Sequence, residues 1–282
     1  MKDQAERLRE LTLHGSRRSG KSSSKIIAVS SGKGGTGKTF LSLNLSYELA
    51  RQNQRVLLID LDFNMSNVEL MMDYQTDKTI YDFFTGHELL TGVISEVESN
   101  LHFIFGYSGM NDYTDPTSSQ IEYLFTALER VKDKYDVIII DTGAGMSPLN
   151  TTILRCVGHN LIVTTPEPTA IMDAYVLIKN LSKSCGITSF QVIINKVPID
   201  DNSANGFDKL SAAVTHFLNS QVKLLGQINY DNNSYKSIID QKVFVLEHPT
   251  SSTRHQISHI ATGLLNYIQM ANNSQHELSR IS

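Results

Sequence analysis

Residues 25–62 read KIIAVSSGKGGTGKTFLSLNLSYELARQNQRVLLIDLD, and this stretch decides the fold. It begins with an apolar run at 26–29, continues through a glycine-rich loop and a helical pattern, and ends with a second apolar run that closes on Asp60 and Asp62. The loop at 32–39 fits the phosphate-binding pattern of glycine, four residues, glycine, lysine, and serine or threonine. The order of strand, loop, helix and strand predicts a phosphate-binding loop in a parallel sheet.

The chemistry of phosphate binding explains the spacing in this loop. Glycines allow the backbone to turn tightly enough for successive N–H groups to point at phosphate oxygens, and the following helix presents its positive N-terminal end to the same anion. We expect Lys38 to reach the terminal phosphates and the hydroxyl of Thr39 to bind Mg2+. The alternative, a flexible glycine turn, does not explain why a strand precedes the loop and a helix follows it.

Composition places the chain among large globular proteins. It has 282 residues, of which 40% are hydrophobic and 19% are charged, enough for one large domain or two small ones. The formal net charge of -4 gives no overall electrostatic attraction to nucleic acid. Cys156 and Cys185 lie far apart in the sequence, which is typical of a reducing compartment. No stretch approaches the roughly 20 apolar residues of a membrane span, so we expect a cytoplasmic protein.

From residue 26 onward, short apolar runs alternate with helical patterns, which is typical of a parallel sheet covered by helices on both faces. We predict strands at residues 26–30, 56–60, 101–105, 137–141, 161–165, 191–195 and 223–228. We predict helices at residues 38–51, 119–132, 170–184, 206–219 and 253–270. No long linker interrupts the alternation, so residues 25–271 are predicted to form one α/β domain with a doubly wound, mostly parallel sheet.

The two ends of the chain differ from this domain. Residues 2–11 favour a short helix and residues 15–24 form a basic linker rich in glycine and serine, so we interpret residues 1–24 as an interaction arm. The alternative is a frayed terminus. Residues 272–282 are predicted to be a polar tail. The helix before this tail has an apolar stripe but little positive charge, which favours packing onto the domain over a position at a membrane surface.

Carboxylates follow two of the predicted strands. Asp141 ends the strand at 137–141 and is expected to hold Mg2+, directly or through water, together with Thr39. The alternative for Asp141 is a simple cap of the following helix. Asp60 and Asp62 end the second predicted strand, where one carboxylate would orient a magnesium-bound water and the other the attacking water.

The run Asn195-Lys-Val-Pro198 ends another predicted strand and is similar to the motif that reads guanine in GTP-binding proteins. Pro198 stands where that motif has its base-reading aspartate, which argues against GTP. We therefore expect Asn195 to bind adenine and the nucleotide to be ATP.

The glycine loop is similar to the deviant phosphate-binding loop of the MinD/ParA class of ATPases, because it carries an additional early lysine, Lys33. The runs Leu57-Leu-Ile-Asp60-Leu-Asp62 and Ile140-Asp141-Thr-Gly-Ala-Gly145 also resemble that class. The resemblance implies that two copies enclose ATP, that Lys33 reaches the nucleotide of the partner, and that Asp62 activates the hydrolytic water.

The pattern and the resemblance together define the expected site. The expected catalytic residues are Lys33, Lys38 and Asp62. The expected nucleotide-binding residues are Gly34, Gly35, Thr36, Gly37, Lys38, Thr39, Phe40, Asn195 and Tyr230, the last of which would cover the base. The expected metal-binding residues are Thr39, Asp60 and Asp141.

Within this class the chain resembles the FlhG family, also called FleN or YlxH, which regulates the number and placement of flagella. Residues 3–9, 165–175 and 242–246 carry this resemblance. The first of these runs is similar to the DQAxxLR arm with which the family stimulates GTP hydrolysis by FlhF, a GTPase of the signal-recognition type. The expected partner-binding residues are Asp3, Gln4, Ala5, Leu8 and Arg9.

The resemblance implies a homodimer that forms with ATP and hydrolyses it. It also implies binding to FlhF, to proteins of the flagellar switch complex (the C-ring) and, in some lineages, to a flagellar transcription regulator. A further implication is peripheral contact with the inner face of the cell membrane. Two alternatives stay open, a MinD-like division-site ATPase and a ParA-like DNA-partitioning ATPase. The net charge of -4 argues against DNA binding.

Overall fold

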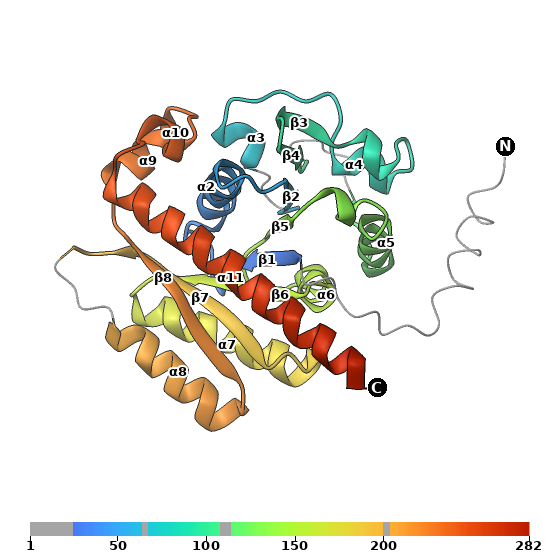
Figure 1. The fold of residues 1–282 in the computed structure, drawn as a ribbon. Helices are drawn as coiled ribbons and strands as arrows, with labels where there is room; N and C mark the ends of the chain where they lie inside the picture. The colour runs from blue at the N-terminus through green and yellow to red at the C-terminus, as the bar shows by residue number, and fades with distance from the viewer. Residues whose placement is uncertain (1–24, 64–66, 108–113, 200–203, 282) are drawn as a thin grey trace.

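A computed structural model describes residues 25–63, 67–107, 114–199 and 204–281 (Figure 1). The strands are β1 (Ile26–Ser30), β2 (Val56–Leu61), β3 (Ser95–Glu98), β4 (Leu101–Ile104), β5 (Val137–Thr142), β6 (His159–Thr164), β7 (Ser189–Val197) and β8 (Gln221–Asn229). The α-helices are α2 (Lys38–Arg51), α3 (Val68–Met71), α4 (Ile80–Phe84), α5 (Ser118–Leu128), α6 (Pro148–Cys156), α7 (Pro168–Cys185), α8 (Ala204–Leu218), α9 (Asn232–Ile239), α10 (Phe244–Glu247) and α11 (Ser252–Ile281). Short 3-10 helices lie at η1 (Leu90–Gly92) and η2 (Lys132–Lys134).

The strands form one sheet in the order β3-β4-β2-β5-β1-β6-β7-β8. All neighbouring pairs are parallel except β3 and β4. β1 lies between β5 and β6, so the connections of the chain diverge to the two sides of the sheet at this strand. Doubly wound sheets bind ligands beyond the carboxyl ends of the strands at such a point. The glycine loop follows β1 directly and therefore lies there.

Successive residues of the central strands point to opposite faces of the sheet, and each face has its own layer of helices. Ile26 and Ala28 belong to the core that includes residues of α4 to α8, whereas Ile27 and Val29 belong to the core that includes α2, α3, α10 and α11. Figure 1 shows α11 running diagonally across the molecule. These two layers confirm the predicted doubly wound α/β fold, since strands buried on both faces need continuous apolar sequences.

Every predicted strand is present, with boundaries that differ by a few residues. The sequence analysis missed β3, an antiparallel edge strand whose sequence Ser-Glu-Val-Glu has one apolar residue. The sequence analysis gave no bounds for α6 between the predicted strands, although two start signals mark this helix. Ser147 accepts a hydrogen bond from the Asn150 N–H as a cap, and Pro148 occupies the first turn.

The C-terminal helix α11 continues to Ile281, past the predicted end at Met270. Residues 272–281, predicted to be a polar tail, are therefore helical. The reason is that no glycine or proline follows Gly263 to end the helix. The predicted arm at residues 1–24, with its expected partner-binding residues, lies outside the described residues. Among the helices that the structure describes, none is both long and apolar enough to cross a membrane.

Candidate functional site

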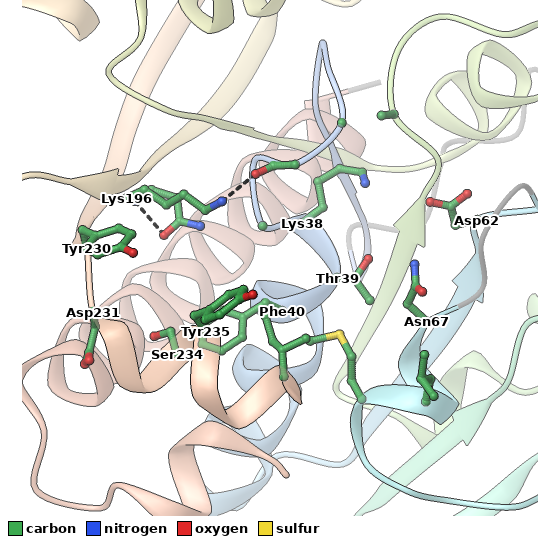
Figure 2. A pocket seen from close by; sticks show the side chains of 18 of the residues that line it. Lys38, Thr39, Phe40, Asp62, Asn67, Lys196, Tyr230, Asp231, Ser234 and Tyr235 are labelled. Carbon is green, nitrogen blue, oxygen red and sulfur yellow. Dashed lines mark hydrogen bonds between the residues drawn. The ribbon is translucent and has the colours of Figure 1, made fainter. Parts of the chain in front are cut away.

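A cavity of about 680 Å³ opens at the carboxyl ends of the strands. The glycine loop, α3, α9 and the ends of β7 and β8 contribute to its wall. Figure 2 shows Asp62 at one end of this cavity, Tyr230 and Tyr235 at the other, and Lys38 and Thr39 between them. The fold therefore brings the predicted loop, carboxylate and base-binding residues to one place.

The glycine loop is held in a tight turn by the end of β7. Gly37 has a φ of 91°, and a Cβ added to it would lie 2.3 Å from Asn195 Nδ2, so both the backbone angle and the space require glycine. Asn195 Nδ2 donates a 2.8 Å hydrogen bond to the Thr36 carbonyl, and Lys196 Nζ donates one of 2.7 Å to the Gly35 carbonyl. These bonds fix the path of the loop from outside it.

Asp60 and Asp141 end two adjacent strands and lie opposite each other in the parallel register of β2 and β5. Both side chains are buried. Burial, followed by the negative charge of Asp60, raises the pKa of Asp141 to about 7, and the positive charge of Lys38 acts in the opposite direction. The Thr39 hydroxyl donates to Asp141 Oδ2 at 2.7 Å, and the Ser42 hydroxyl donates to Oδ1 at 2.8 Å. Asp141 is therefore fixed beside the loop.

Asp60 organises the segment after β2 through backbone hydrogen bonds. Its Oδ1 accepts from the Asp62 N–H at 3.0 Å, and its Oδ2 accepts from the N–H groups of Asn67 and Val68 at 3.2 Å and 3.3 Å. Asp62 lines the cavity, and its Oδ1 would lie 3.4 Å from a Cβ placed on Gly143. Asp62 is thus located between the segment after β2 and the loop after β5.

The residues at this end of the cavity fit phosphate and Mg2+. The buried Thr36 hydroxyl has no hydrogen-bond partner within the described residues, so the loop retains a polar atom for a phosphate oxygen. Asp60, Asp141 and Thr39 offer only oxygen donors, the type that Mg2+ prefers. In the described part of the chain no three His, Cys, Asp or Glu side chains cluster to hold a metal. Mg2+ in nucleotide sites is usually bound by one or two protein side chains and completes its ligands with substrate phosphates and water.

Lys33 lies at the protein surface and not on the cavity wall. Its Nζ is 2.6 Å from Glu167 Oε2 and 3.3 Å from Thr169 Oγ1, at the start of α7. The hydrogen bond from Lys33 lowers the pKa of Glu167. Lys38, in contrast, is buried and lines the cavity. The two lysines of the loop therefore lie in different places: Lys38 on the cavity wall and Lys33 at the protein surface.

The residues predicted for adenine, Asn195 and Tyr230, both line the cavity. Phe40 lines it too and packs against Phe244, with ring centroids 5.6 Å apart. Asn195 already uses both ends of its amide, because Nδ2 donates to the loop and Oδ1 accepts from the Lys196 N–H at 2.9 Å. In this structure Asn195 therefore acts on the shape of the loop.

Sequence reasoning missed Ser42, Glu167, Lys196 and Tyr235 as residues of the site. Ser42 lies three positions after Thr39 on α2, a spacing that places both hydroxyls on one helix face and marks Ser42 as a second partner of the strand-end carboxylate. Glu167 and Lys196 reach the loop from 134 and 161 residues away, which no local pattern reveals.

Comparison with known proteins places this site in a family. A family model described as an AAA domain matches residues 24–194. The antiactivator FleN of Pseudomonas aeruginosa is 32% identical over 227 residues, which cover 80% of this chain and 81% of that protein. The flagellum site-determining protein YlxH of Helicobacter pylori is 30% identical over 246 residues, which cover 87% of this chain and 83% of that protein.

Solved structures share the fold. The cell division ATPase MinD of Pyrococcus furiosus matches with a TM-score of 0.73 and 22% identity over 86% of this chain and 99% of that chain. MinD of Pyrococcus horikoshii, complexed with Mg-ADP, matches with a TM-score of 0.71 and 23% identity over 84% and 94%. The family model and the two curated relatives confirm the predicted class of ATPase. The chain belongs to the FleN/YlxH family of MinD/ParA-class ATPases.

Proposed function

We propose that this ATPase is a switch that dimerises with ATP and regulates the number and placement of flagella. The name of one relative supports the flagellar role, since YlxH is a flagellum site-determining protein. The observation that carries the switch is the position of Lys33, which belongs to the phosphate-binding loop but lies at the surface, paired with Glu167. A loop lysine that does not line the cavity of its own chain can contact the nucleotide bound to a second copy of the chain.

Within one chain, each group has a role in binding and hydrolysis. The loop N–H groups and Lys38 bind the phosphates, and the Thr36 hydroxyl adds a hydrogen bond. Asp62 positions the attacking water. Thr39, Asp60 and Asp141 would hold Mg2+, whose charge neutralises the phosphate oxygens when it is bound.

Dimer formation completes the site with a residue of the second copy. Lys33 leaves Glu167 and Thr169 and reaches the phosphates of the partner. The ion pair that breaks is exposed, so its loss costs little compared with the new contact to a phosphate. Hydrolysis removes the terminal phosphate and with it the anion that held Lys33, so that the copies separate.

The switch acts on flagellar partners through surfaces that the dimer creates. We propose that Asp3, Gln4, Ala5, Leu8 and Arg9 of the N-terminal arm stimulate an FlhF-type GTPase. Proteins of the flagellar switch complex and a flagellar transcription regulator are the other proposed partners. The name antiactivator, given to FleN, supports a regulator of transcription among them.

Molar mass in solution tests the switch. Asp62→Ala removes the group that positions the water, so that the ATP-bound state persists. By light scattering we expect this variant to have the 31.5 kDa mass of one chain without nucleotide and about twice that mass with Mg-ATP. Adding Lys33→Ala to Asp62→Ala should keep the protein monomeric in Mg-ATP, because the contact across the dimer is lost.

The same experiment identifies the result that would refute the switch. If the Asp62→Ala protein binds Mg-ATP, as measured by calorimetry, but stays at the monomer mass at every concentration tested, the dimer mechanism is wrong. A dimer that forms equally well without Lys33 would remove the proposed role of that residue.

A further inference from the structure

We propose that Tyr235 is a base-binding residue, which stacks on the nucleotide base at the end of the cavity opposite the carboxylates. The inference rests on the proposed nucleotide site and adds a residue to it. Tyr235 lies on α9 and lines the cavity together with Tyr230, which precedes this helix. Tyr235 is 65% exposed, which leaves its ring open to a ligand.

The shape of the cavity fixes which part of a nucleotide meets Tyr235. Lys38, Thr39 and Asp62 occupy one part of it, and Tyr230 and Tyr235 lie at the far end (Figure 2). Phosphates bound at the loop therefore direct the nucleoside toward the tyrosines. A planar ring with polar edges is the chemical group that matches this lining, because Phe40, Ile238 and the tyrosine rings offer apolar surface, whereas Asn229 and Ser234 offer polar atoms.

The two tyrosines are held on separate, well-anchored supports. The Tyr230 N–H donates a 2.7 Å hydrogen bond to the Val197 carbonyl, which ties the end of β8 to the end of β7. Asp231 caps α9 by accepting from the Asn233 N–H at 2.8 Å. Gln241, just after α9, donates at 3.0 Å to the Leu70 carbonyl at the end of α3, which joins α9 to a second helix that lines the cavity.

Stacking would add to any hydrogen bonds that the base makes with Asn195. The Asn195 amide is held by one hydrogen bond at each end, from Nδ2 to the Thr36 carbonyl and from the Lys196 N–H to Oδ1, and keeps one N–H and one lone pair for a ligand. In the described part of the chain, the rings of Tyr230 and Tyr235 have no aromatic partner. A purine base bound between the glycine loop and α9 would supply an aromatic partner for these rings.

Binding of two probes to the full chain tests the inference. Isothermal titration calorimetry would measure Mg-ATP, which has a base, and magnesium pyrophosphate, which has none. For Tyr235→Ala we expect Mg-ATP affinity to fall about 5- to 100-fold, the range for loss of one base–aromatic stack, with pyrophosphate affinity unchanged. Tyr235→Phe should keep nearly normal affinity, because the ring remains.

Ile239→Ala is the matched control, because Ile239 lies on the same helix, is 60% exposed and is not on the cavity wall. This variant should bind both probes like the unchanged protein. Unchanged Mg-ATP affinity in Tyr235→Ala would overturn the inference. An equal loss of both probes would also overturn it, since Tyr235 would then support the loop and not the base. If the unchanged chain bound neither probe, the proposed nucleotide site itself would be wrong.

Discussion

At the scale of single residues, the buried carboxylates of Asp141 and Asp60 lie close enough to repel each other. The side chain is fully buried beside a second buried carboxylate, Asp60, and burial is the main reason why its pKa rises to about 7. Two hydroxyls, from Thr39 and Ser42, donate to it and favour the charged form. A bound cation would reduce the repulsion between the two carboxylates. This repulsion is therefore largest in the protein without Mg2+ and nucleotide.

The raised pKa predicts how stability depends on pH. The folded protein holds the Asp141 proton up to about pH 7, whereas the unfolded chain releases it near 3.8. The protonated Asp141 side chain therefore contributes to the free energy of unfolding at low pH. This contribution, roughly 4 kcal/mol at most, is lost as pH rises from about 4 to about 7. Asp141→Asn cannot ionise, so its free energy of unfolding should lack this fall.

Urea unfolding of the magnesium-free and nucleotide-free proteins at several pH values measures the effect. The stability of the unchanged protein relative to Asp141→Asn should decrease steadily between about pH 4.5 and about pH 7.5. A relative stability that stays constant over this range would contradict the prediction.

At the scale of elements, α2 connects the glycine loop to the C-terminal helices. Its first residue is Lys38 of the loop, and Asn44 Oδ1 accepts a hydrogen bond from the Val245 N–H of α10 at 3.0 Å. Glu48 of α2 pairs with Arg254 of α11 at 2.8 Å. The exposed fractions of these two side chains are 2% and 17%, so water screens this ion pair weakly.

Breaking this ion pair should destabilise the whole domain. Arg254→Met leaves the Glu48 carboxylate buried without its cationic partner, and we expect the free energy of unfolding to fall by about 3 kcal/mol. The double variant Glu48→Leu with Arg254→Met should recover much of this loss, because no buried charge remains. Urea unfolding followed by circular dichroism gives both values.

Lys242→Met is the control for this comparison. It removes an ion pair with Glu247 whose side chains are 56% and 46% exposed, so the expected loss is below about 1 kcal/mol. If Arg254→Met cost no more than Lys242→Met, the pair between α2 and α11 would not stabilise the domain.

At the scale of the whole molecule, the phosphate-binding loop and the first described residue lie at opposite ends of a central strand. β1 and its loop lie in the middle of the sheet, and the first described residue, Lys25, is at the opposite end of β1 from that loop. The described chain therefore begins on the side away from the carboxyl ends of the strands. We expect that the proposed arm, residues 1–24, can be removed without loss of any residue of the cavity.

Deletion of residues 1–15 tests this separation. The shortened protein should hydrolyse ATP at the rate of the full chain, because every residue of the cavity remains. It should no longer stimulate GTP hydrolysis by a purified FlhF-type GTPase, since the proposed contact residues are gone. Phosphate release assays measure both reactions. Stimulation that survives the deletion would refute the role of the arm.

Much of the fold was predictable because it depends on patterns among residues that are close together in the sequence. Continuous apolar runs marked the central parallel strands of the buried sheet, including Ile26–Ser30 with its observed boundaries. Polar or short elements such as β3 were missed, since Ser-Glu-Val-Glu carries little apolar signal. The end of α11 was misplaced because a polar composition does not end a helix when glycine and proline are absent.

The sequence by itself determined the doubly wound fold, the phosphate-binding loop and the family, since these depend on residues that are neighbours along the chain. Only the tertiary structure decided that Asn195 braces the loop, that Lys33 is paired with Glu167 and that Tyr235 faces the cavity. These relations join residues far apart in sequence, and the order of strands in the sheet brings them together. A local pattern shows which side chains are available, and packing decides which of them meet.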